Sequence, residues 1–253
     1  MNEEILYKAR QTVVEAGLTL ARSSLTVGTY GNISCRIDEE LIAITPSGRD
    51  YQQLGPEDIV ITDMEGNLLG IPGVLGNRDC DSNTAGTDSA ESKEKGGTPA
   101  VTLHPSSELP LHLEIYKNFP EARAIVHTHS IYASALAAAH RDLPPIMEDL
   151  AQITGGAVRC TEYTIAGTKE LGQKAVEAME GGRSAALLAN HGAVCWGRNM
   201  KEALAAAQIL EKGAQIYYIA RSFGTPFPLN EKTVATLHDF YLNHYSKRQQ
   251  GEE

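Results

Sequence analysis

Two histidine motifs, each directly after a short apolar run, most constrain the fold of this 253-residue chain. His127 and His129 follow the apolar residues 124–126, and His191 follows the apolar residues 187–189. Residues i and i+2 of a strand point to the same face, so His127 and His129 can reach one metal ion together. His191 joins them only where two strand ends converge, which would give a three-histidine metal site with an open position. Spacing alone also fits histidines with a purely structural role. The other five histidines, expected to be structural or exposed, are His104, His112, His140, His238 and His244.

Hydrophobic periodicity predicts one mixed sheet with helices on both faces. Strands are predicted at 33–37, 41–45, 59–62, 124–129, 158–163, 185–189 and 194–197. The first three follow one another through tight turns, which indicates antiparallel pairing. Helices are predicted at 4–24, 106–119, 130–140, 168–180, 200–222 and from 230 to about 244. Ser106 or Ser107 and Thr168 are the expected N-caps of two of these helices.

Residues 76–99 interrupt this pattern because they contain no aromatic or branched aliphatic residue. Such a segment cannot offset its ordering entropy by burial, so we expect a flexible surface insertion. A lid over the functional site is the alternative. The length of the chain suits one large domain or two small ones, and we expect a single domain over 1–253 that carries this insertion.

Composition argues against several classes of function. The net charge of −10 disfavours general affinity for nucleic acid or for an acidic membrane surface. No run approaches the roughly 18 uncharged apolar residues of a membrane helix, and the N-terminus carries no secretory signal. The four cysteines form no CxxC pair, which indicates reduced thiols. We therefore expect a cytoplasmic protein that acts on a small molecule.

Three short polar segments have a chemistry that suits an anion such as phosphate. The segments are Gly31-Asn32, Ser47-Gly48 and Ser106-Ser107. Each offers backbone N–H groups and short polar side chains, and the last would lie at a helix N-terminus, where the helix dipole favours negative charge. Each also fits an ordinary turn or cap. Glu108, directly after the serines, either stabilises the helix dipole or acts as a general acid/base or fourth ligand beside a metal.

Taken together, these motifs resemble the class II aldolase/adducin family, which includes fuculose-1-phosphate aldolases and ribulose-5-phosphate 4-epimerases. The matching segments, in family order, are 29–34 (TYGNIS), 44–48 (ITPSG), 105–108 (PSSE), 127–129 (HTH) and 190–192 (NHG). The resemblance covers roughly residues 4–245 apart from the insertion. It implies an α/β fold, a three-layer α/β/α sandwich around a mixed, largely antiparallel sheet. It also implies a homotetramer with sites at the subunit interfaces.

The same resemblance assigns roles to individual residues. It implies Zn²⁺, or another divalent ion such as Mn²⁺ or Co²⁺, on His127, His129 and His191, with Glu108 as acid/base and as a ligand when substrate is absent. The phosphate of a sugar phosphate is expected among Gly31, Asn32, Ser47, Gly48, Ser106 and Ser107. The implied reaction cleaves a ketose 1-phosphate to dihydroxyacetone phosphate and an aldehyde through a metal-stabilised enediolate.

One segment departs from the family pattern. In fuculose-1-phosphate aldolases a tyrosine of the neighbouring subunit serves the aldehyde end, whereas residues 144–149 contain no tyrosine and place Glu148 there. Tyr241 and Tyr245 do not align with that family's tail tyrosine. Glu148 is expected to be a second acid/base, with a surface or interface carboxylate as the alternative, and it leaves epimerase, dehydratase and decarboxylase chemistry open. A non-catalytic, adducin-like assembly module is the remaining alternative, although it would not need three histidines and Glu108.

Overall fold

The centre of the molecule is a seven-stranded sheet with the order β3-β2-β1-β4-β7-β6-β5. The computed structural model describes residues 2–69 and 103–250, so the insertion expected at 76–99 lies outside the described residues. The strands are β1 (Asn32–Arg36), β2 (Leu41–Ile44), β3 (Val60–Asp63), β4 (Ala124–Thr128), β5 (Arg159–Cys160), β6 (Ala185–Leu188) and β7 (Gly192–Gly197). Among these described strands, only β5 and β6 pair in parallel. The prediction of a mixed, largely antiparallel sheet is confirmed.

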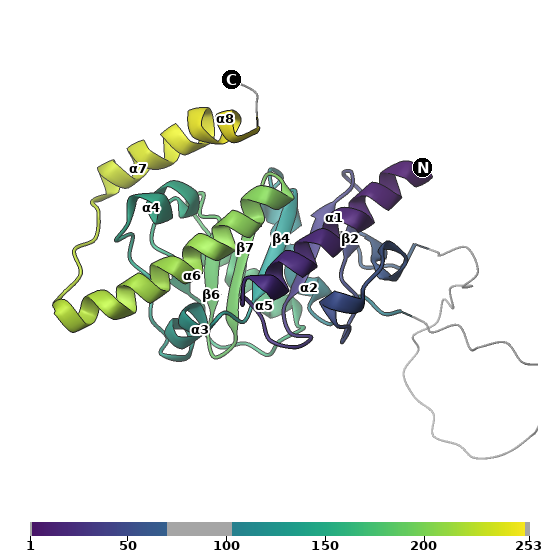
Figure 1. Cartoon of the computed structure of the whole chain (residues 1–253), viewed down its shortest axis with the longest axis horizontal. Coiled ribbons are helices and arrows are strands. Elements are labelled where there is room, and N and C mark those ends of the chain that lie inside the picture. Colours follow the sequence, from purple (N-terminus) through teal and green to yellow (C-terminus); the bar gives the residue numbers. More distant parts are fainter. Residues whose placement is uncertain (1, 70–102, 251–253) are drawn as a thin grey trace, which may run out of the picture.

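Helices cover both faces of the sheet and complete the three-layer sandwich, with α1 and α6 crossing in front of the strands in Figure 1. One core lies under α1 (Glu3–Arg22), α3 (Ile131–Ala138), α4 (Glu148–Thr154) and α6 (Met200–Phe223). The opposite core lies under α2 (Leu109–Asn118) and α5 (Lys169–Ala178). Strand alternation divides the side chains between the two cores. On β4, Val126 packs into the first core and Ile125 into the second.

Capping decides where the helices next to the site begin. Thr168 caps α5 as predicted, since its hydroxyl accepts a hydrogen bond from the Leu171 N–H at 3.3 Å. The prediction that Ser106 or Ser107 caps α2 is wrong. The helix begins at Leu109 with Glu108 in the N-cap position, because the Ser106 hydroxyl accepts a hydrogen bond from the Glu108 N–H at 3.2 Å. The Glu108 side chain makes no capping bond and is directed elsewhere.

Two further segments differ from the sequence prediction. The strand predicted at 158–163 is reduced to the two residues of β5, because Val158 forms backbone hydrogen bonds with Leu143. Helix α4 was not predicted. It has seven residues and no side-chain cap, and it is held by the burial of Leu150 and Ala151. Both differences reflect tertiary contacts that override weak local signals.

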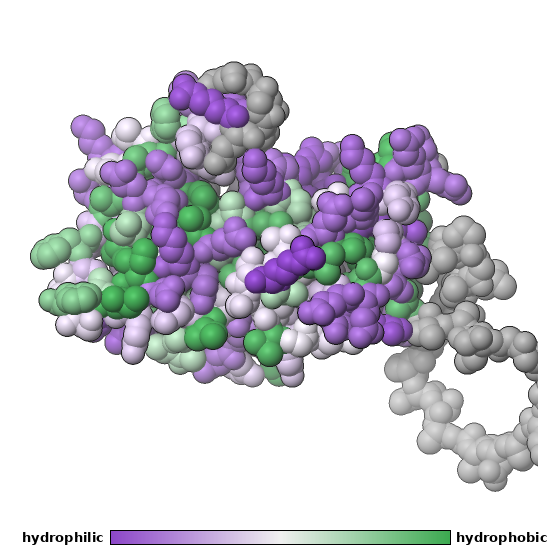
Figure 2. Space-filling model, in the orientation of Figure 1, coloured by the Kyte–Doolittle hydropathy of each residue, from purple (hydrophilic) through white to green (hydrophobic). Residues whose placement is uncertain are grey.

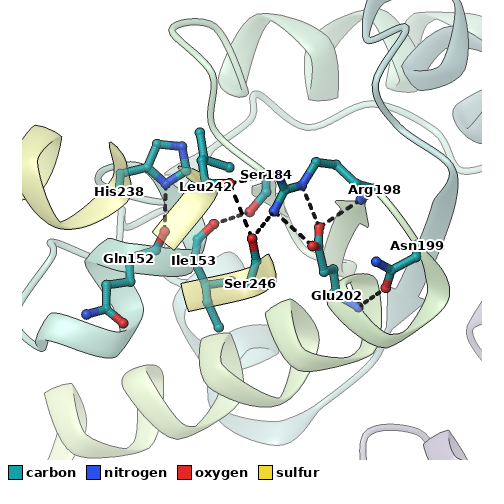
Figure 3. Close-up of polar contacts among 9 residues, drawn as sticks. All are labelled: Gln152, Ile153, Ser184, Arg198, Asn199, Glu202, His238, Leu242 and Ser246. Atoms are coloured by element: carbon teal, nitrogen blue, oxygen red, sulfur yellow. Dashed lines mark hydrogen bonds and ion pairs between the residues drawn. The ribbon is translucent and has the colours of Figure 1, made fainter. Parts of the chain in front are cut away.

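The C-terminal helix extends further than the predicted end near residue 244. It comprises α7 (Glu231–Phe240), a π-helical turn, η3 (Tyr241–Tyr245), and α8 (Ser246–Gln250). His238 fastens it to the body by donating a hydrogen bond from Nδ1 to the Gln152 carbonyl at 2.6 Å. Arg198 fastens it again by donating to the Leu242 carbonyl and to the Ser246 hydroxyl, at 3.2 and 2.8 Å (Figure 3).

In residues 2–69 and 103–250, no helix combines the length and the apolar character that a membrane span requires. Three cysteines lie in these ranges, Cys35, Cys160 and Cys195, and all three are free thiols. Burial raises the pKa of the Cys195 thiol to about 12, so this group is a small apolar core residue at neutral pH.

Candidate metal centre

Antiparallel pairing brings residues that are far apart in the sequence to one end of the sheet. Asn32 at the start of β1 lies opposite His127 of β4, and His127 lies opposite Val194 of β7. His129 follows β4 directly and His191 directly precedes β7. The strand ends therefore converge as the histidine spacing predicted.

Glu108, His127, His129 and His191 form one cluster, in which one possible ligand atom of each residue lies within 4.8 Å of all the others. The two carboxylate oxygens of Glu108 lie 3.0 Å from His127 Nε2 and 3.3 Å from His191 Nε2. The Nε2 atoms of His127 and His129 are 2.9 Å apart. The structure thus brings together the four residues that the sequence proposed as a metal site.

The orientation of His127 identifies which of its nitrogens is free to bind a cation. Its Nδ1 lies 2.9 Å from the carbonyl oxygen of Ala193. Because a carbonyl can only accept a hydrogen bond, Nδ1 carries a proton, and Nε2 is the nitrogen that faces the cluster. A backbone carbonyl that fixes the tautomer in this way is a common support for metal-binding histidines.

The cluster contains more acceptors than its own protons can satisfy. Glu108 Oε1 is buried without a hydrogen-bond partner among the described residues. Two imidazole nitrogens at 2.9 Å can share at most one proton when both rings are neutral. Three nitrogens and a carboxylate are the donors that Zn²⁺ and similar divalent ions take. The residues present therefore fit such an ion.

Electrostatics keep the cluster in the protonation state that binds cations. Burial alone would raise the pKa of Glu108, but attraction and hydrogen bonding by His127, attraction by His191 and a hydrogen bond from Asn32 hold it well below its usual range. Burial, together with repulsion from His127, lowers the pKa values of His129 and His191 to about 4. At neutral pH these causes keep Glu108 ionised and His129 and His191 neutral.

A pocket of about 360 Å³ opens beside the cluster and contains all three phosphate segments expected from the sequence. Its lining includes Gly31, Asn32, Ser47, Gly48, Ser106 and Ser107 together with Glu108, His129 and His191. Two N–H groups expected to be free are already bonded, that of Ser47 to the His104 carbonyl and that of Ser106 to the Thr45 carbonyl. The serine hydroxyls and the Asn32 amide are therefore the main side-chain donors on this wall.

Two small residues allow backbones to approach closely around the cluster. Gly31 has a φ of +76°, and a side chain there would meet the His127 carbonyl at 2.8 Å. At Gly192 a Cβ would lie 2.3 Å from the Thr128 carbonyl. Just before it, Asn190 adopts a left-handed φ of 54° and is held by hydrogen bonds to Ala137 and His140. The His191 turn is thus pressed against β4, which only these residue types permit.

Other residues proposed from the sequence lie outside this pocket. Glu148 is exposed at the first residue of α4 and is not among the residues that line the pocket. Tyr241 and Tyr245 belong to the C-terminal helix. Tyr30, which was given no role, lies at the rim with its ring 5.5 Å from that of His129, and it is 65% exposed.

The sequence interpretation also missed a buried set of residues behind Glu108, which includes Ser34, His112 and Tyr116. Two signals could have found them. His112 follows Glu108 by four residues on a predicted helix, and Ser34, on the strand predicted at 33–37, follows Asn32 by two. Each pair therefore shares one face of its element.

Comparison with known proteins gives concordant results. The model of the class II aldolase and adducin N-terminal domain matches residues 11–218. A 5-deoxy-D-ribulose 1-phosphate aldolase of Bacillus thuringiensis is 37% identical over 92% of this chain and 95% of its own length. A 5-methylthioribulose-1-phosphate/5-deoxyribulose-1-phosphate aldolase of Rhodospirillum rubrum is 32% identical over 86% and 83%. The solved structure of an L-fuculose 1-phosphate aldolase superposes with a TM-score of 0.77, at 33% identity over 93% of this chain and 96% of that chain. With the family model covering most of its length and these relatives spanning nearly all of it, the chain belongs to the class II aldolase and adducin family.

Proposed function

We propose that this protein is a divalent-metal-dependent aldolase that cleaves a ketose 1-phosphate to dihydroxyacetone phosphate and an aldehyde. The observation that carries the proposal is the cluster of Glu108, His127, His129 and His191, of which all but the buried His127 line a pocket with a polar wall. The names of the two relatives favour a 5-deoxypentulose 1-phosphate, and hence a short aldehyde, as the substrate to test first.

In this proposal the metal is held by His127, His129 and His191, with Glu108 as a further ligand until substrate arrives. Zn²⁺ is the first choice, with Mn²⁺ and Co²⁺ as alternatives, because the donor set is nitrogen-rich. Bound there, a divalent ion would supply Lewis acidity that polarises the carbonyl and hydroxyl oxygens of the ketose and offsets the negative charge that develops in cleavage.

The protein's own groups perform the remaining work. Glu108, an ionised carboxylate within 3.3 Å of both His127 and His191, is expected to move the proton of the reacting carbon or its hydroxyl. Gly31, Asn32, Ser47, Gly48, Ser106 and Ser107 are proposed to hold the phosphate. Hydroxyl and amide donors bind such an anion without a lysine, and the N-terminus of α2 adds its dipole.

We also propose a homotetramer, in which Glu148 acts as an acid/base in the pocket of a neighbouring subunit. Glu148 is exposed and does not line the pocket of its own chain. Large apolar side chains are exposed near the end of α6, with Phe223 86% and Phe227 89% accessible, and Figure 2 shows apolar surface over this end of the molecule. Burial of such residues between subunits is a common cause of assembly.

The test combines metal analysis with product analysis. Purified protein is reconstituted with Zn²⁺, Mn²⁺ or Co²⁺ and incubated with 5-deoxyribulose 1-phosphate and with fuculose 1-phosphate, and release of dihydroxyacetone phosphate is measured. Metal-dependent release supports the proposal. Conversion of substrate without carbon fragments would favour an epimerase or a dehydratase, and release of carbon dioxide from a sugar-acid phosphate would favour a decarboxylase. A protein that binds no metal after reconstitution would favour the assembly module.

A further inference from the structure

A continuous chain of buried hydrogen bonds runs from Glu108 into the protein, on the side away from the pocket. The bonds join Glu108 Oε2 to Asn32 Nδ2 (2.8 Å), Asn32 Oδ1 to His112 Nε2 (2.5 Å), His112 Nδ1 to Ser34 Oγ (2.7 Å) and Ser34 Oγ to the Tyr116 hydroxyl (2.9 Å). All five residues are buried, and His112 and Ser34 are completely inaccessible. Side-chain networks of this kind are costly unless every member is satisfied.

The direction of each bond follows from Glu108. An ionised carboxylate can only accept, so the Asn32 NH₂ group faces Glu108 and the Asn32 oxygen faces His112. His112 must then donate from Nε2. Burial lowers the pKa of His112 to about 3, with repulsion from His127 contributing, so the ring carries one proton and its Nδ1 accepts.

The remaining two bonds are then fixed as well. Ser34 donates its single hydroxyl proton to His112 Nδ1. In its bond with Tyr116, Ser34 must therefore be the acceptor and the Tyr116 hydroxyl the donor. Burial raises the pKa of Tyr116 well above its usual value, so Tyr116 keeps the proton that it donates. Every proton in the chain therefore points towards Glu108, an arrangement in which successive bonds polarise one another.

We propose that His112 is a positioning residue that holds the Asn32 amide in the one orientation in which its NH₂ group serves both Glu108 and the substrate phosphate. One hydrogen of this NH₂ group binds Glu108, and Asn32 also lines the pocket, so the other is available to an anion there. Without His112 the Asn32 oxygen would be buried without a donor, and the bond to Glu108 alone would hold the amide. This inference rests on the proposed function only for the identity of the anion.

The first test reads the tautomer of His112 directly. Histidine labelled with ¹⁵N is incorporated into the metal-free protein, and the ring signals that disappear in His112→Gln identify His112. The proposal requires a neutral ring protonated at Nε2 throughout the neutral pH range. A ring protonated at Nδ1, or at both nitrogens, would overturn it. This readout involves no substrate, so it stands apart from any failure of the aldolase proposal.

The second test compares two variants of similar length. His112→Gln places an amide N–H near the position of Nε2, whereas His112→Met fills the space without a donor. We expect the Met variant to lose about 10- to 100-fold in kcat/KM for the cleaved ketose 1-phosphate, the range typical for loss of a residue that supports a metal-site side chain, and the Gln variant to recover most of it. Equal loss in both variants would contradict the proposal.

A double variant then tests whether His112 affects kcat/KM through Asn32. If His112 acts through Asn32, His112→Met should change kcat/KM by less than about 3-fold when Asn32 is already Ala. A full additional loss in the Asn32→Ala background would show that His112 acts by another path. Should the Met variant fail to fold, Ser34→Ala, which removes the donor to Nδ1, provides the same comparison in a smaller side chain.

Discussion

Two polar clusters in different parts of this molecule each contain a buried carboxylate, Glu108 in one and Glu202 in the other, and they differ in how well their atoms are paired. At the C-terminal helix, Arg198 donates to Glu202 from Nε and Nη2 at 3.0 and 2.9 Å and also binds Leu242 and Ser246 (Figure 3). In the candidate metal cluster (Glu108, His127, His129 and His191), Glu108 Oε1 has no hydrogen-bond partner among the described residues, and the Nε2 atoms of His127 and His129 lie 2.9 Å apart.

The volume of the pocket beside each cluster does not follow this difference in pairing. The cavity next to Arg198 and Glu202 measures about 500 Å³, against about 360 Å³ at the metal cluster. Size therefore does not distinguish the functional site from a structural contact. Unsatisfied acceptors that converge on one point do, because the fold tolerates them only where a ligand completes them.

Replacement of the carboxylate in each cluster by an amide should give the largest difference between the two clusters. We expect Glu108→Gln to fold and bind metal but to lose about 10²- to 10⁴-fold in kcat, the usual contribution of a general acid/base. Glu202→Gln should keep its kcat and lose stability instead. Both are measured by dihydroxyacetone phosphate release and by urea unfolding. Unchanged turnover in Glu108→Gln would remove Glu108 from the mechanism.

One histidine of the candidate metal cluster and one of the C-terminal helix provide the second contrast. His129→Ala removes a proposed ligand and should weaken metal affinity by more than roughly 100-fold, beyond the range seen when only outer-shell partners are lost. His238→Ala removes a histidine whose Nδ1 binds the Gln152 carbonyl, and metal affinity should not change. Competition with a chromogenic chelator measures both values, and similar losses in the two variants would argue against the ligand assignment.

Breaking the paired cluster should affect stability alone. Arg198→Met removes a cation from the buried Glu202 carboxylate, and because the Arg198 side chain is 31% exposed the free energy of unfolding should fall by less than the roughly 3 kcal/mol of a fully buried pair. The double variant Arg198→Met/Glu202→Leu should regain much of that loss, since the charge is gone as well. Urea unfolding measures the free energy, and limited proteolysis should report release of the C-terminal helix in the single variant only.

The smallest expected effect is a pH dependence confined to the neighbourhood of the metal cluster. The pKa of His112 is lowered to about 3 in the fold, against an ordinary value near 6.5 in the unfolded chain. Below pH 6.5 the unfolded state binds a proton at this histidine and the folded state does not. The free energy of unfolding therefore decreases as the pH is lowered, by up to about 1.4 kcal/mol per pH unit. Metal-free wild type should therefore lose more stability between pH 7 and pH 5 than His112→Gln does. Parallel losses would contradict the buried, neutral state of His112.

The sequence predicted the fold and the cluster where local patterns carry three-dimensional information. The i, i+2 spacing of His127 and His129 settles their common face, and apolar runs before them and before His191 predict rigid strand ends. The six residues of the phosphate segments line one pocket. Their sequence signal was again local, because each lies in a turn next to a predicted helix or strand.

Other features could not be predicted because their partners are remote in sequence. The partner of His112 is 80 residues away, so the helix pattern alone presented it as one more structural residue. Helix α4 depends on tertiary burial of Leu150, and β5 is short because Val158 pairs with Leu143. The protonation states of Glu108 and His129 likewise depend on burial, which no local pattern records.

The strand order β1-β4-β7 has a consequence for the order in which the protein folds. The cluster draws on residues 108, 127, 129 and 191, and its supporting amide comes from residue 32, so the contacts that build it close long loops. Such contacts form late, after local helices and hairpins. A nascent chain that ends before residue 191 lacks one of the four residues of the proposed metal site. For the metal-dependent enzyme proposed above, metal binding would therefore report that β1, β4 and β7 have assembled.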